Sequence, residues 1–217
     1  MGQPTLLEQA LQAERDQRYS DAYRTFLDCL RLPQHDTGDI SFHLGWCLEQ
    51  DKESDKEEVL AHYRRAVDLA SGPACRANAM FRMGWILMHE RHYPGAEEMF
   101  LKAAEYCETV GLRVGVHDHA LYWYAVCLES RGCYLEALKW YDSVRRVSAQ
   151  LDPESRFRQI VCLNQIGAYD NALKVCMTFD QPSPAGFDET RYRQLRQSAD
   201  VERMMLQTLL ATNGTAR

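Results

Sequence analysis

The chain has 217 residues, of which 46% are hydrophobic and 26% are charged, which is the balance of a folded protein and not of a disordered one. It carries 25 Lys and Arg residues against 31 Asp and Glu residues, and this net charge of −6 gives no general attraction to the phosphates of nucleic acids. No run of about 18 apolar residues occurs, so we expect no membrane insertion.

The N-terminal segment MGQPTLLEQALQAERD has charged residues where a secretory signal peptide needs an apolar core. We therefore expect a cytoplasmic protein in which the eight cysteines are reduced thiols. The sequence has no C-x-x-C pair, and no cysteine pair lies near a histidine pair at zinc-finger spacing. We accordingly predict no metal site and no cofactor.

An internal repeat organises the chain. The stretch from Phe42 to Leu48 (FHLGWCL) returns 39 residues later as Phe81 to Leu87 (FRMGWIL). A ladder of aromatic and small residues recurs downstream, with the spacing of three or four positions that forms one stripe on a helix. Five copies of the ladder are present: Tyr19, Ala22, Phe26 and Cys29; Val59, Tyr63 and Ala66; Tyr93, Ala96, Phe100 and Ala103; Tyr134, Ala137, Tyr141 and Val144; Tyr169, Ala172, Cys176 and Phe179. Each unit is therefore predicted to be a pair of helices.

Punctuating residues indicate where these helices begin and end. Three prolines stand where first turns are expected: Pro73, Pro94 and Pro153. Asp152 has the chemistry of an N-cap, and Ser54-Asp55-Lys56-Glu57 has a capping-box pattern that would begin the second helix of the second unit. Gly132 and Gly167 are expected in the turns between paired helices.

These motifs resemble the tetratricopeptide repeat, whose signature runs from an aromatic residue through Leu-Gly to Tyr, Ala, Phe and Pro. The third unit fits best, through Met83, Gly84, Leu87, Tyr93, Ala96, Phe100 and Ala103. The resemblance implies an all-α fold, a right-handed superhelical solenoid of about five helical hairpins plus a C-terminal helix. The array is predicted over residues 1–184, with units at about 4–37, 38–76, 77–116, 117–152 and 153–184. Units one, four and five depart from the signature glycine, with Ala10, Ala125 and Ile160 in its place.

Residues 185–217 are predicted to contain a linker, a C-terminal capping helix and a disordered tail from Thr212. The helix is expected over residues 188–211, with six apolar residues available for burial: Tyr192, Leu195, Val201, Met204, Met205 and Leu209. Such a helix would shield the last repeat. The alternative is that it detaches, or fills the groove in place of a partner.

The resemblance also implies that the first helix of each hairpin lines a concave inner surface, in a register fixed by Gly45 and Gly84. Aromatic residues and arginines at inner positions are typical anchors of protein interfaces. We predict a partner-binding surface formed by Phe42, His43, Trp46, Phe81, Arg82, Trp85, Tyr122, Trp123, Phe157 and Arg158. The rings of Phe42, Phe81, Tyr122 and Phe157 are also expected to pack between neighbouring helices.

No arrangement of nucleophile, acid and base appears, so we predict no catalytic residue and no enzyme. The Lys, Asn and Arg clamp of some co-chaperones in this family is absent, because the matching positions hold Leu7, Leu11, Phe42 and Trp46. The main hypothesis is a scaffold or adaptor that binds an apolar or amphipathic peptide or helix of another protein. Two alternatives stay open: a chaperone or assembly factor for an apolar client, as among secretion chaperones, and a self-assembling homo-oligomer.

Overall fold

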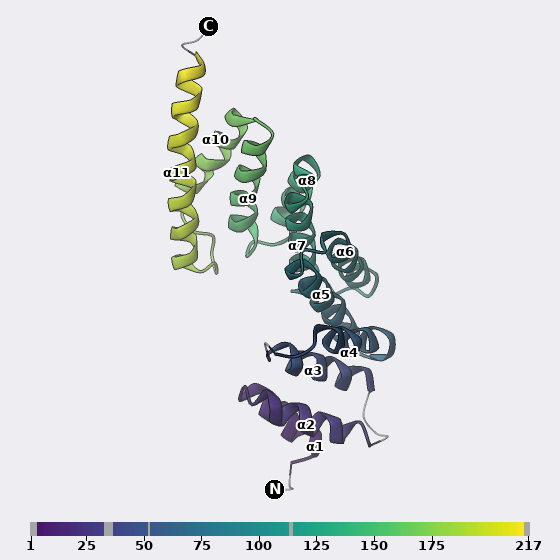
Figure 1. The fold of residues 1–217 in the computed structure, drawn as a ribbon. Coiled ribbons are helices and arrows are strands. Elements are labelled where there is room, and N and C mark those ends of the chain that lie inside the picture. The colour runs from purple at the N-terminus through teal and green to yellow at the C-terminus, as the bar shows by residue number, and fades with distance from the viewer. Residues whose placement is uncertain (1–3, 33–36, 52, 113–114, 215–217) are drawn as a thin grey trace. The chain divides into compact units, whose positions relative to one another are not determined.

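The computed structural model describes residues 4–32, 37–51, 53–112 and 115–214, and within them the chain is helical, with eleven α-helices, one short 3₁₀ helix and no strand. Figure 1 shows the chain as a succession of helices, labelled in chain order. The chain forms two compact units, residues 1–116 and residues 117–217. No helix among the described residues is both long and apolar enough to cross a membrane.

The first unit contains three helical hairpins. Its helices are α1 (Leu6–Arg15), α2 (Tyr19–Cys29), α3 (Thr37–Glu49), α4 (Lys56–Leu69), α5 (Pro73–His89) and α6 (Tyr93–Thr109). Each helix packs against the next one in the chain. The all-α fold and its pairing of successive helices are as predicted from the repeat ladder.

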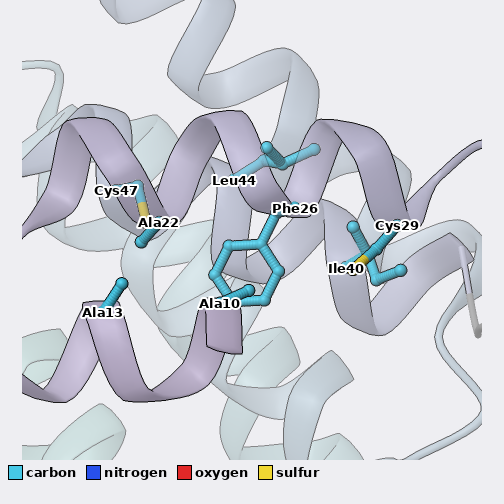
Figure 2. Close-up of a cluster of buried hydrophobic side chains, with 8 residues drawn as sticks. All are labelled: Ala10, Ala13, Ala22, Phe26, Cys29, Ile40, Leu44 and Cys47. Atoms are coloured by element: carbon cyan, nitrogen blue, oxygen red, sulfur yellow. The ribbon is translucent and has the colours of Figure 1, made fainter. Parts of the chain in front are cut away.

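The ladder residues form the core between these helices. Ala22, Phe26 and Cys29 of α2 are buried together with Ala10 of α1 and Leu44 of α3. Figure 2 shows the ring of Phe26 directed towards Ala10, where a larger side chain would keep the two helices apart. The same arrangement explains the alternation of small and aromatic residues along the ladder.

Close approach of helices also explains two glycines. A Cβ atom at Gly84 would lie 2.9 Å from Cδ1 of Phe100, so this residue allows α5 to rest on the ring of its own hairpin partner. At Gly38 the crowding is with backbone, because a Cβ atom there would lie 2.0 Å from the nitrogen of Ala70. Residues larger than glycine are therefore excluded where α3 begins.

The turns inside four hairpins share one backbone conformation. Two residues before the ladder tyrosine, φ is +80° at Gly132 and +73° at Gly167. The equivalent residues of the first and third hairpins adopt the same left-handed conformation, with φ 60° at Gln17 and φ 59° at Arg91. The prediction for the two glycines is confirmed. Gln17 and Arg91 have a Cβ atom, so the left-handed conformation is strained at these two residues, whereas glycine adopts it readily.

Two predicted helix caps are wrong in detail. Helix α4 is capped by Asp55 and not by Ser54, because the Asp55 side chain accepts the hydrogen bond from the backbone N–H of Glu57. In α9 the N-cap is Leu151, which makes no side-chain cap. The Asp152 carboxylate instead accepts a hydrogen bond from Nε of Arg145 at 2.8 Å. It also forms an ion pair with Arg156 at 2.9 Å. Two guanidinium partners outcompete the capping role of this carboxylate.

The second unit contains two hairpins and a long final helix. Its helices are α7 (Val116–Ser130), α8 (Tyr134–Val147), α9 (Asp152–Gln165), α10 (Tyr169–Met177), the 3₁₀ helix η1 (Thr178–Asp180) and α11 (Glu189–Gly214). Helix α11 packs on α9 and α10 through Tyr192, Leu195, Ala199 and Leu206. The hydroxyl of Tyr192 donates to the carbonyl of Gln181 at 2.8 Å, which fixes the segment before the helix.

Two expectations for the C-terminal region are wrong. The helix continues through Gly214, beyond the predicted end at residue 211, and residues 215–217 lie outside the described part of the chain. Four of the six apolar residues available for burial are exposed, with exposed fractions of 57% for Val201, 68% for Met204, 53% for Met205 and 38% for Leu209. A single helix packed on one side buries one stripe only, and these residues lie outside it.

Candidate functional site

All ten residues of the predicted surface lie on the first helices of hairpins. In the first unit α3 carries Phe42, His43 and Trp46, and α5 carries Phe81, Arg82 and Trp85; in the second unit α7 carries Tyr122 and Trp123, and α9 carries Phe157 and Arg158. Tyr122 is buried, and the other nine side chains are partly exposed. The structure thus places each set of residues on a continuous stretch of helix.

The first aromatic position of each helix packs against the second helix of the same hairpin. The ring centroids of Phe42 and Tyr63 are 5.7 Å apart, and those of Phe81 and Phe100 are 5.5 Å apart. Tyr122 lies 5.9 Å from Tyr141 in the same manner. These rings contribute to hairpin packing, as expected from the sequence.

The guanidinium of Arg82 is already paired inside the first unit. Its Nε donates to Oε2 of Glu49 at 3.0 Å, its Nη2 binds Oε1 of the same carboxylate, and both side chains are largely shielded from solvent. The hydroxyl of Tyr63 donates to Oε2 of Glu49 at 2.6 Å. The Arg82 guanidinium also lies 4.9 Å from the ring of Trp46 and 5.8 Å from the ring of Trp85. Arg82 therefore joins two hairpins and holds both tryptophans in place.

The second unit repeats this arrangement. Nη1 of Arg158 donates to Oε1 of Glu129 at 3.0 Å, and the hydroxyl of Tyr141 donates to Oε2 of Glu129 at 2.7 Å. Burial opposes the charge of Arg158, but Glu129 together with Tyr122 and Tyr141 outweighs it and holds the pKa of Arg158 above its usual range. Burial, reinforced by Glu129, raises the pKa of Tyr141 well above its usual range. Arg158 keeps a 37% exposed side chain, more than Arg82 with 20%.

A histidine takes the place of the arginine in the first joint. Nδ1 of His43 lies 2.8 Å from Oε2 of Glu14, and the imidazole stacks on Phe26 with a centroid distance of 4.9 Å. We call these three groupings the hairpin joints: Glu14 with His43, Glu49 with Arg82, and Glu129 with Arg158. In each, the carboxylate stands four residues after the small-residue position of its helix, at Ala10, Gly45 or Ala125.

The second unit also has an open cavity of about 510 Å³ on this face. Helices α7, α9 and α11 line it, with Tyr122, Trp123, Phe157 and Arg158 from the predicted surface beside His119, Leu151, Glu154, Arg191, Gln194, Leu195 and Ser198. Arg191 binds Glu154 through two hydrogen bonds, at 2.5 Å from Nε and 3.0 Å from Nη2. Four predicted residues thus meet in one hollow, and α11 completes its wall.

A smaller cavity of about 170 Å³ lies in the first unit. Its lining includes Trp85, Leu48, Val59 and Ile86, and the ion pair between Lys56 and Glu90 lies at its rim. Trp46, Phe42 and Phe81 do not reach it. Its volume suits one apolar side chain.

Comparison with known proteins agrees with this geometry. Residues 81–150 match the sequence model of the tetratricopeptide repeat. MamA (AMB-1) superposes with a TM-score of 0.62 at 13% identity over 90% of this chain and 99% of that chain. PilF of Pseudomonas aeruginosa gives 0.65 at 14% identity over 94% of this chain and 95% of that chain. The fold is that of a tetratricopeptide-repeat array.

PlcR of Bacillus thuringiensis, in a complex with the peptide PapR7 and DNA, superposes with a TM-score of 0.55 at 12% identity over 96% of this chain and 72% of that chain. No curated protein matches the sequence itself. At these identities the likeness concerns the tetratricopeptide-repeat fold alone.

Sequence reasoning missed the carboxylates of the tetratricopeptide-repeat joints and the contribution of α11 to the cavity. A signal for the carboxylates was present, since Glu14, Glu49 and Glu129 share one position of the repeat. The basic residue that each one binds stands 29 or 33 positions later in the chain. For α11 no comparable signal existed, because Arg191 and Gln194 lie outside the repeat pattern.

Proposed function

We propose that this protein is an adaptor that binds a segment of another protein on the inner helices of its second unit. The observation that carries the proposal is the cavity formed by α7, α9 and α11, where two aromatic side chains, Trp123 and Phe157, stand beside Arg158 and Arg191. Large aromatic rings supply contact area and arginines supply directed hydrogen bonds, which is the composition of interface anchors.

The charge of the second unit favours a protein over a nucleic acid as the partner. Residues 117–217 contain 12 Lys and Arg and 12 Asp and Glu, so the whole excess of negative charge lies in residues 1–116. A unit without net positive charge gains little from phosphate neutralisation. PlcR, which shares the fold, is described in a complex that includes a peptide, and this lends support to a peptide-like ligand here.

Each residue of the predicted surface has a different part in this proposal. Trp123 and Phe157 provide apolar contacts, while Arg158 and Arg191 keep outward donors beyond those used by Glu129 and Glu154. Within the first unit, Trp85 lines a pocket for one apolar side chain, and Trp46 covers Arg82. Phe42, His43, Phe81, Arg82 and Tyr122 act mainly by holding these surfaces in shape.

Affinity capture with the purified chain, read by mass spectrometry, tests the proposal. The double variant Trp123→Ala/Phe157→Ala should lose the partner that wild type retains, and Trp46→Ala/Trp85→Ala reports separately on the first unit. Leu135→Ala is the matched control, because Leu135 is 65% exposed on the second helix α8. All variants should keep the helical circular-dichroism spectrum of wild type.

A partner kept equally by wild type and by Trp123→Ala/Phe157→Ala would contradict the proposal. Recovery of this chain alone, with a mass that rises with concentration in sedimentation, would favour the self-assembling alternative. Improved solubility of a co-expressed apolar client would instead favour the chaperone alternative.

A further inference from the structure

Helix α11 is divided into two chemically different halves. Residues 190–199 contain three arginines, Arg191, Arg193 and Arg196, and no Asp or Glu. Residues 204–214, MMLQTLLATNG, contain no charged residue. A helix that only capped the array would carry polar residues on its outer side along its whole length.

A fourth pair, Asn164 with Glu202, corresponds in position to the hairpin joints and places α11 in register with the preceding first helices. Nδ2 of Asn164 donates to Oε2 of Glu202 at 2.8 Å, so Asn164 stands at the joint position of Glu129, and Glu202 stands at that of Arg158. Val201, the residue before Glu202, then corresponds to Phe157. Val201 and Met205 accordingly occupy inner positions of the repeat, and both are more than half exposed.

The exposed apolar residues of α11 form a surface that continues from the cavity. Val201, Met204, Met205 and Leu209 follow one another at intervals of three, one and four positions, and we call them the α11 stripe. Ser198, which lines the cavity, is three positions before Val201 and seven before Met205, so all three share one face of the helix. From Arg191 to Met205 this face extends about 21 Å, at about 1.5 Å per residue.

We propose that the occupant of this surface is an amphipathic segment of a partner protein, acidic at the end that meets Arg191 and apolar at the end that covers the α11 stripe. The inference rests on the proposed function and adds the chemistry and direction of the ligand. Charge complementarity sets the acidic end, because Arg158 and Arg191 line the cavity with Glu154 as the one carboxylate among its lining residues, whereas the α11 stripe carries no charge. Methionines adapt to varied apolar shapes, which suits the other end. A ligand that spans both needs about 14 residues as a helix.

A second copy of the chain fits the α11 stripe less well. A stable interface uses about 20–30 residues a side, and two stripes facing each other would bring together only four side chains from each copy. The stripe becomes a sufficient interface when its occupant also enters the cavity beside Phe157 and Arg158. A single segment that runs along α11 does so.

Selection of random 16-residue peptides displayed on phage, against the whole chain, tests this inference. Enriched peptides should carry Asp or Glu near one end and Leu, Ile, Phe or Met at spacings of three and four towards the other. One such peptide, labelled with fluorescein, is then titrated by fluorescence anisotropy against four variants. Met205→Lys should weaken binding at least about tenfold, because a charge would enter the apolar contact. Arg191→Gln should weaken it about fivefold and reduce its dependence on salt.

The matched control is Gln207→Lys. Gln207 is exposed and lies two positions after Met205, which directs it to the other side of the helix, so this variant should bind within about twofold of wild type. Phe157→Ala separates the two proposals. Binding that needs Phe157 but tolerates Met205→Lys and Arg191→Gln overturns this inference and leaves the proposed function standing. Enrichment of basic peptides overturns the inference as well.

Peptides that tolerate Phe157→Ala as well as the α11 variants, or a selection without enrichment, would count against both proposals. Sedimentation of the free chain completes the test. A dimer that Met205→Lys converts to a monomer would show that a second copy covers the α11 stripe, and would overturn the inference.

Discussion

Glu49 binds Arg82 across two successive hairpins, and the ring of Trp46 covers the guanidinium at 4.9 Å. The same relationship between Glu129 and Arg158 in the other unit shows that it belongs to the repeat and not to one position. Residues that sequence reasoning assigned to ligand recognition thus serve first to connect hairpins. Their contact with a partner depends on the donors that remain exposed, and these are more accessible on Arg158 than on Arg82.

The first prediction concerns the Glu49 joint. Arg82→Met should lower the free energy of unfolding by about 2–3 kcal/mol, because it leaves the shielded Glu49 carboxylate without its cationic partner. The double variant Arg82→Met/Glu49→Met should be less destabilised than the sum of the single variants. Urea unfolding of the four proteins measures the difference. Additive effects would show that the pair has no coupling, and Arg64→Met, at a largely exposed ion pair with Glu57, is the control.

The second prediction is a loss of stability at high pH. Burial, followed by the charge of Glu49 or Glu129, raises the pKa of Tyr63 and Tyr141 well above the ordinary value. The unfolded chain releases these protons near pH 10, while the folded chain holds them. The contribution to stability is therefore present below about pH 10 and lost as the pH rises further.

The double variant Tyr63→Phe/Tyr141→Phe should show a shallower fall in the free energy of unfolding between about pH 9.5 and pH 11. At neutral pH it should be less stable by about 1 kcal/mol for each hydrogen bond removed. Urea unfolding across this pH range provides the measurement. An unchanged slope would mean that the two phenols do not remain protonated in the folded state.

The third prediction concerns the left-handed turn residues. Arg91→Gly should raise the free energy of unfolding by about 0.5–1 kcal/mol. The substitution removes a left-handed strain that costs roughly 1–2 kcal/mol for a residue with a Cβ atom. This gain exceeds the loss that comes from the greater freedom of glycine in the unfolded chain. Gly132→Arg, the reverse exchange at the equivalent turn, should lower it by a similar amount. Thermal unfolding of both variants is the measurement, and a destabilising Arg91→Gly would contradict this account.

The fourth prediction concerns which cysteine thiols react in the folded protein. Burial, with a smaller contribution from Glu14 or Glu129, raises the pKa of Cys47 and of Cys162 to about 12. Because the thiolate is the reacting form, these thiols should not react with dithiobisnitrobenzoate at pH 8 in the folded protein. Cys75 and Cys133 are partly exposed and should react first, whereas the six buried thiols should react only after unfolding. Rapid reaction in the variant Cys75→Ser/Cys133→Ser would contradict this.

The repeat ladder predicted the helices because its residues are determined by packing inside one hairpin. Ala22 and Phe26, or Ala96 and Phe100, are close in sequence, and their sizes alone indicate where two helices meet. The cap of α9 could not be predicted in this way. Asp152 is held by Arg145 and Arg156, and competition among three polar groups is not visible in a local pattern.

Less of the candidate site than of the fold could be predicted from the sequence. The register of the first helices placed Tyr122, Trp123, Phe157 and Arg158 on one side, and the structure brings all four to the same cavity. The contribution of Arg191 depends on how α11 packs, which no repeat pattern encodes. Similarly, Met204 and Met205 are exposed because they lie outside the stripe of α11 that packs on α9 and α10, which depends on the neighbouring helices and not on α11 alone.

The pair of Asn164 and Glu202 bears on how a further hairpin could be attached to α11. Glu202 occupies the place of a basic residue, which puts Thr208 at the position where Glu14, Glu49 and Glu129 stand in their helices. A hairpin added after α11 would find a hydroxyl group in place of the carboxylate that receives its Arg or His. Thr208→Glu is therefore the change with which an engineered extension should begin.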